Sequence, residues 1–225
     1  SLGTLLDRGY VTQWLVCGPF RSDLEGGIVA AVGAGSAPLG NVDFMQPLGG
    51  IARIRPNHLD KVKTPDAPQG EPAIWQRAKG VDETFDLAPF FPKASEGVSY
   101  AAFYTNSERD VSAYVDVQTV LGARIWLNGF PVRDIRPASV VNGGADRFMA
   151  SFRQGANLMV LEVPGATFEA LAPVTGLDVD ALRARVIQTR PLLKGTSGFQ
   201  FALRIKAVRQ LGNLAYLPSL ESTGG

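Results

Sequence analysis

Apolar and polar residues alternate along two long segments of the chain. Side chains of successive residues in a β-strand point to opposite faces, so alternation predicts strands with one buried face and one solvated face. Over residues 111–119 one face carries Val111, Ala113, Val115, Val117 and Thr119, and the other carries Ser112, Tyr114, Asp116 and Gln118. In the last predicted strand, the residues expected to point inward are Phe199, Phe201, Leu203 and Ile205.

The segment 123–135 is predicted to form a β-hairpin around Asn128-Gly129. Asn and Gly tolerate the positive φ that both central residues of a type I′ turn require, and the twist of this turn matches that of the flanking strands. A second turn signal, Gly155-Ala-Asn157, precedes an apolar strand that runs to Val163. This order of strands and turns is typical of an antiparallel β-sandwich.

The rest of the chain frames these strands. Residues 11–20 predict an apolar strand, and residues 21–69 predict a long loop excursion with a short helix near 24–33. Short strands are expected at 75–78 and at 84–87. Apolar residues at helical spacing in 177–188, with Asp178 at the N-cap position, predict one helix before the final strand.

Three short words in the sequence carry a resemblance: Trp14-Leu-Val-Cys-Gly-Pro-Phe20, Ile125-Trp-Leu-Asn-Gly129 and Gly155-Ala-Asn-Leu-Met-Val-Leu-Glu-Val163. They resemble the galactose-binding-like jelly roll attached to multidomain glycoside hydrolases, in particular the sandwich that precedes the catalytic barrel of β-galactosidases and β-glucuronidases. The resemblance implies an all-β antiparallel jelly-roll sandwich over residues 1–210, with a long loop insertion and one short helix. Residues 211–225 are then expected to be a linker.

The same resemblance implies a non-catalytic accessory module of a carbohydrate-active enzyme, exported from a bacterium. Its expected partner is a catalytic domain in the same or a neighbouring chain, and its expected location is secreted or periplasmic, with the cytoplasm left open. Fold alone does not determine function, so two alternatives stay open. One is a structural or assembly domain without sugar binding, and the other is a self-contained glycoside hydrolase.

Composition narrows the possible partners. The 225 residues carry 22 basic and 21 acidic side chains, a net charge of +1, which gives no overall attraction to nucleic acid or to an anionic membrane. The single cysteine, Cys17, excludes an internal disulfide and a thiolate zinc site, and its apolar neighbours predict a buried position. No apolar run reaches the length of about 18 residues that a membrane span needs.

Candidate catalytic groups are sparse, and we expect neither a catalytic residue nor a metal or other cofactor. The only histidine, His58, lies in a predicted loop. The chain contains no Gly-x-Ser-x-Gly nucleophile elbow that could pair with it. Glycoside hydrolysis needs two facing carboxylates, and the acids that a self-contained hydrolase would bring together are Asp82, Glu83, Asp86 and Asp116.

Aromatic side chains offer the remaining route to function. A sugar ring stacks its apolar C–H face on Trp or Tyr, while its hydroxyls exchange hydrogen bonds with polar side chains. Trp75, Tyr104 and Arg124 lie near predicted strand ends and are candidate carbohydrate-binding residues, with packing in the core or at a domain interface as the alternative for the aromatics. Trp126 has the opposite parity to Ala123, Ile125 and Leu127, which makes it a candidate for a domain interface.

Overall fold

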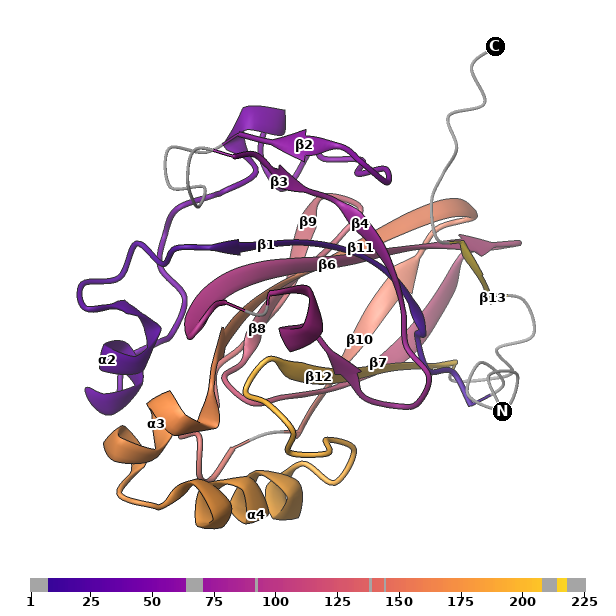
Figure 1. Cartoon of the computed structure of the whole chain (residues 1–225). Coiled ribbons are helices and arrows are strands. Elements are labelled where there is room, and N and C mark those ends of the chain that lie inside the picture. The colour runs from indigo at the N-terminus through magenta and orange to yellow at the C-terminus, as the bar shows by residue number, and fades with distance from the viewer. Residues whose placement is uncertain are drawn as a thin grey trace.

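The computed structural model describes residues 8–63, 71–91, 93–137, 139–143, 145–207 and 214–217. Two antiparallel sheets pack face to face (Figure 1). The larger sheet has the strand order β4 (Gln76–Lys79), β1 (Gln13–Phe20), β6 (Glu96–Ser107), β11 (Gly155–Ala166), β8 (Ala123–Leu127) and β9 (Phe130–Ile135), with β13 (Leu214–Leu217) also paired to β6. The smaller sheet has the order β10 (Ala145–Phe152), β7 (Val111–Thr119), β12 (Gln200–Ala207) and β5 (Phe85–Asp86).

The chain passes repeatedly from one sheet to the other. β6 lies in the larger sheet, β7 in the smaller, β8 and β9 in the larger, β10 in the smaller, β11 in the larger and β12 in the smaller. This alternation is typical of a jelly roll, in which strands that are consecutive along the chain often lie in opposite sheets. The predicted all-β antiparallel sandwich is confirmed.

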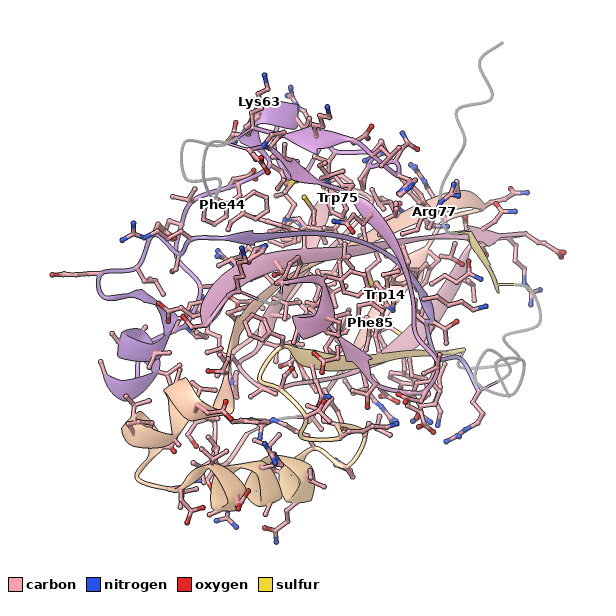
Figure 2. The ribbon with its side chains drawn as sticks, viewed as in Figure 1. Trp14, Phe44, Lys63, Trp75, Arg77 and Phe85 are labelled. Atoms are coloured by element: carbon pink, nitrogen blue, oxygen red, sulfur yellow. The ribbon has the colours of Figure 1, made fainter. Side chains whose placement is uncertain are left out.

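The inner core fills the space between the sheets. Trp14 belongs to this core, and its ring lies nearly perpendicular to those of Phe103 and Phe201 at centroid distances of 5.1 and 4.9 Å. Phe85 packs on the same indole at 6.0 Å, and Figure 2 shows both side chains on the same side of β1. The residues predicted to point inward from 111–119 and from the last strand belong to this core, except that Thr119 is buried outside it and Val111 is only partly buried.

A second apolar cluster covers the outer face of the larger sheet. The excursion after β1 contains α2 (Gly27–Gly33), the 3-10 turn η1 (Gln46–Leu48) and β2 (Lys61–Val62), and β2 pairs with β3 (Ala73–Ile74). Phe44, Met45 and Trp75 belong to one buried cluster with Tyr100 and Tyr104 of β6. Figure 2 shows Phe44 and Trp75 on the side of β1 opposite Trp14. The expected loop excursion is therefore a third layer.

The described residues contain three α-helices, one more than the short helix near 24–33 and the helix before the final strand that the sequence predicts. α4 (Val179–Thr189) matches the predicted helix, and Asp178 caps it by accepting the Ala181 N–H at 2.7 Å. α2 matches the short helix expected near 24–33. α3 (Phe168–Thr175) was not predicted, because Pro173 within it argues against a helix; Thr167 caps its N-terminus all the same.

Arg190 joins α4 to the sandwich from a fully buried position. Its guanidinium donates to the carbonyl oxygens of Thr119, Val120 and Val140 at 2.6, 3.1 and 3.0 Å. Burial lowers the pKa of Arg190 to about 10. The carbonyl oxygens thus satisfy a cation that has left water.

The predicted hairpin is confirmed. β8 and β9 pair across residues 123–135, and Asn128 and Gly129 have φ values of 53° and 84°. The segment expected to be a linker contains β13, which pairs antiparallel with residues 104–107 of β6. The other residues of 208–225 lie outside the described part of the chain.

Candidate functional site

A pocket of about 670 Å³ is lined by residues that lead into α2, the helix on the left in Figure 1. We call it the end pocket. The end of β1, the loop that leads into α2, and the residues before β6 form its walls. Its described lining is Pro19, Phe20, Arg21, Ser22, Leu24, Gly26, Gly27, Phe91, Lys93, Ala94, Ser95 and Glu96. The volume falls in the range typical of small-molecule sites.

The floor of the end pocket is apolar and held by the core. Phe20 is buried, stacks on Phe44 at a centroid distance of 5.1 Å, and places its edge against Tyr100 at 5.7 Å. Phe91 follows the 3-10 turn η3 (Ala88–Phe90), is also buried, and packs against Phe90 at 6.5 Å. The floor is therefore anchored in both apolar clusters, since Phe91 belongs to the inner core and Phe20 to the outer one.

Glu96 fixes the polar wall of the end pocket. Its Oε2 accepts the Val29 N–H at 2.8 Å, which serves the first turn of α2 in place of the missing side chain of Gly26. Gly27 has a φ of 86°, and a Cβ built on it would lie 2.1 Å from Glu96 Oε1. A glycine at this position allows the carboxylate to approach the backbone.

Glu96 is the only carboxylic acid in the described lining of the end pocket. Arg21 and Lys93 are exposed on its rim, and Ser22 and Ser95 add hydroxyl groups. Glycoside hydrolysis uses two carboxylates across the scissile bond. An apolar floor with a polar rim and a single carboxylate suits binding better than hydrolysis.

The described residues contain no group of three or more His, Cys, Asp or Glu side chains placed to hold a metal ion. No described helix combines the length and apolar character that crossing a bilayer requires. His58 accepts the Arg77 N–H at 3.3 Å and so braces a turn. Burial raises the pKa of Cys17 to about 12, which keeps the thiol protonated.

No protein-family model matches the chain, and no curated protein sequence matches it. Among solved structures, a β-glucosidase from Kluyveromyces marxianus in complex with glucose aligns over 68% of this chain with 11% identity and a TM-score of 0.39. A selenomethionine-labelled form of that β-glucosidase aligns with a TM-score of 0.37 and 14% identity, over 68% of this chain and 17% of its own.

A family 35 carbohydrate-binding module from Clostridium thermocellum aligns over 31% of this chain and 66% of its own, with 17% identity and a TM-score of 0.25. The first β-glucosidase match spans only 16% of that longer chain. These neighbours are a glycoside hydrolase and a carbohydrate-binding module. The TM-scores and sequence identities are too low to support an argument about this chain.

The residues predicted to bind carbohydrate lie away from the end pocket, on the covered face of the larger sheet. Trp75 and Tyr104 are 0% and 1% exposed, and Tyr104 donates its hydroxyl hydrogen to the Pro56 carbonyl at 3.0 Å. Arg124 is partly buried and donates to the Gly40 carbonyl at 2.5 Å. Because their rings are covered, Trp75 and Tyr104 offer no free face for a sugar. Their placement does not support a binding role.

Trp126 is half-buried on β8 and is absent from the inner core that holds Ala123, Ile125 and Leu127. This agrees with the parity read from the sequence. In the register of the β8–β9 hairpin, Trp126 lies opposite exposed Pro131, and the neighbouring Phe130 is 73% exposed. The interface role expected for Trp126 stays a prediction.

A buried polar trio on the covered face was missed by sequence reasoning. Tyr100 donates its hydroxyl hydrogen to Glu162 Oε2 at 2.6 Å, and Arg124 Nη2 lies 2.8 Å from Glu162 Oε1. Burial raises the pKa of Glu162 above its ordinary value, against the opposing effects of Tyr100 and Arg124. A lone acid within the apolar strand 158–163 was the signal that could have revealed it.

The four acids considered for a self-contained hydrolase do not converge on one site, and each is engaged by another residue. Asp82 and Asp86 line a depression of about 350 Å³, where Asp82 pairs with Lys194 and Asp86 accepts from Ser197 at 2.7 Å. Glu83 pairs with Arg8 at 3.0 Å. Asp116 lies on the outer face of β7 and binds Arg147 and Arg204.

Proposed function

We propose that the chain is a non-catalytic accessory module of a carbohydrate-active enzyme and that it binds a sugar in the end pocket. The end pocket carries this proposal, because its accessible apolar lining, which includes partly buried Pro19, Leu24 and Ala94, and its polar rim match the two chemistries of a sugar. The ring of a sugar presents apolar C–H groups, while its hydroxyls need hydrogen-bond partners. The parent enzyme is proposed to be exported, with its catalytic domain in the same or a neighbouring chain.

Calorimetric titration of the chain with mono- and oligosaccharides tests this function. We expect weak binding, on the order of millimolar to micromolar, since an open pocket forms few fully buried contacts and ordering the ligand has a cost. Ala94→Trp fills the end pocket and should abolish the heat of binding.

Ser112→Trp provides the matched control, because Ser112 is exposed on β7 and lies outside the lining of the end pocket. This variant should bind as the wild type does. The proposal fails if no saccharide gives heat, or if Ser112→Trp abolishes the heat and Ala94→Trp does not.

A second candidate function, bracing of a catalytic domain, is favoured by the exposed side chain of Phe130. A large apolar side chain exposed at a hairpin tip, beside half-buried Trp126, is a feature of docking surfaces. In the intact parent protein, Phe130→Asp should lower the melting temperature if the hairpin docks on the next domain. An unchanged melting temperature would exclude this hairpin as the brace.

A further inference from the structure

The charges around the end pocket are unequal. Arg21 and Lys93 reach its rim from two segments about 70 residues apart in the sequence, and both are exposed. Neither forms an ion pair or side-chain hydrogen bond with another described residue, so both charges are available to a ligand. Two unpaired cations at one opening are thus a feature of this pocket.

The single acid of the end pocket is already occupied. Glu96 Oε2 accepts the Val29 N–H, and Oε1 faces the backbone of Gly27. The carboxylate is therefore directed toward α2. With two cations and one engaged carboxylate, the lining has a net charge of +1 and a surplus of donors.

We propose that the end pocket selects an anionic sugar, one whose ring carries a carboxylate or a sulfate. This inference rests on the proposed sugar-binding function and names its ligand class. The apolar lining of the end pocket, where Pro19, Leu24 and Ala94 are only partly buried, contacts the C–H face of the ring, and the acid group lies at the rim. The Arg21 guanidinium presents a planar pair of donors that fits a carboxylate or a sulfate, and Lys93 adds a point charge.

The size of the effect follows from the exposure of both cations. Ion pairs between exposed groups are weak and are screened by salt, whereas hydrogen bonds to a charged group strengthen when a ligand excludes water. We therefore expect loss of either cation to weaken binding of the anionic sugar by about tenfold at low salt.

Titration with trigalacturonate and with its methyl ester tests the proposal, because the ester keeps the sugar and removes the charge. At about 50 mM salt the Debye length is roughly 14 Å, so exposed charges are only partly screened. Under this condition trigalacturonate should bind about tenfold more tightly than the ester. Arg21→Gln and Lys93→Gln should remove this preference and leave the affinity for the ester unchanged. Lys61→Gln, an exposed lysine on β2 outside the pocket lining, should leave both affinities unchanged.

The outcomes separate this inference from the function on which it rests. Equal affinity for trigalacturonate and its ester, together with equal affinity for galactose 6-sulfate and galactose, overturns the anionic preference while sugar binding stands. No heat from either form, or from any neutral oligosaccharide, overturns both. Galactose 6-sulfate against galactose distinguishes the acid groups: a preference shown only by this pair assigns sulfate, and one shown only by trigalacturonate assigns carboxylate.

Discussion

The outer faces of the two sheets differ in what covers them. β6 and β11 are buried along almost their whole length on both faces, because the excursion lies over the larger sheet. β7 and β10 alternate between buried and exposed positions, and Tyr114 and Met149 are 38% and 47% exposed on the smaller sheet. A strand pattern alone therefore does not reveal whether a third layer exists.

The difference also appears in two carboxylates, one on each outer face. Glu162 on β11 is buried, and burial raises its pKa. Asp116 on β7 is partly exposed; burial alone would raise its pKa, but hydrogen bonds from Arg147 and Arg204 lower it below the ordinary value. The covered face thus disfavours charge, and the open face accommodates it.

The largest contrast should come from removing one tyrosine from each face. Tyr104→Ala should reduce the free energy of unfolding by about 3–5 kcal/mol, because it opens a cavity under the excursion and frees the Pro56 carbonyl. Tyr114→Ala on the open face should change it by only about 0.5 kcal/mol. Urea denaturation of both variants measures the two losses, and equal losses would contradict the third layer.

Substitutions at two glycines distinguish the cost of backbone strain from the cost of a clash with the excursion. Gly129 and Gly155 have φ values of 84° and 87°, but only at Gly129 would an added Cβ meet another backbone, 2.2 Å from the Ala52 oxygen. Gly155→Ala should therefore cost about 1–2 kcal/mol, and Gly129→Ala roughly twice as much. Thermal unfolding compares them. Equal shifts in melting temperature would mean that the hairpin does not contact the excursion.

The smallest effects concern pH, and they have opposite signs on the two faces. Because the pKa of Glu162 is raised on folding, the native state binds its proton more tightly, and wild type should gain stability over Glu162→Gln as the pH falls from 7 toward 4.5. Folding lowers the pKa of Asp116 from an unfolded value near 3.8, so the ionised carboxylate stabilises the native state above that pH. Wild type should therefore lose stability relative to Asp116→Asn as the pH falls below about 3.8. Urea denaturation at each pH measures the difference in unfolding free energy between wild type and each variant. If both differences changed with pH in the same direction, the opposite pKa shifts of Glu162 and Asp116 would be contradicted.

Local signals in the sequence were sufficient for the inner core. Alternation in 111–119, the Asn128-Gly129 turn and the Asp178 cap all depend on neighbours within a few residues. The third layer was not predicted, because Phe44, Ile54 and Trp75 are isolated apolar residues without a period. Trp75 and Tyr104 were consequently named as candidate carbohydrate-binding residues, whereas they are core residues under the excursion.

The candidate site was beyond sequence reasoning for a related reason. Phe20 and Phe91 come from distant segments that only the folded sandwich brings to one pocket. The Glu96 contact with α2 spans 67 residues, and no local pattern marks it. Alternation predicts which side chains are buried, but it does not predict which loop ends meet.

A crystal structure of the chain grown with trigalacturonate tests the central claim most directly. The account predicts sugar density in the end pocket, with a ring against Pro19, Leu24 and Ala94 and the carboxylate beside Arg21 and Lys93. Density on the open face beside Tyr114, with the end pocket empty, would contradict it.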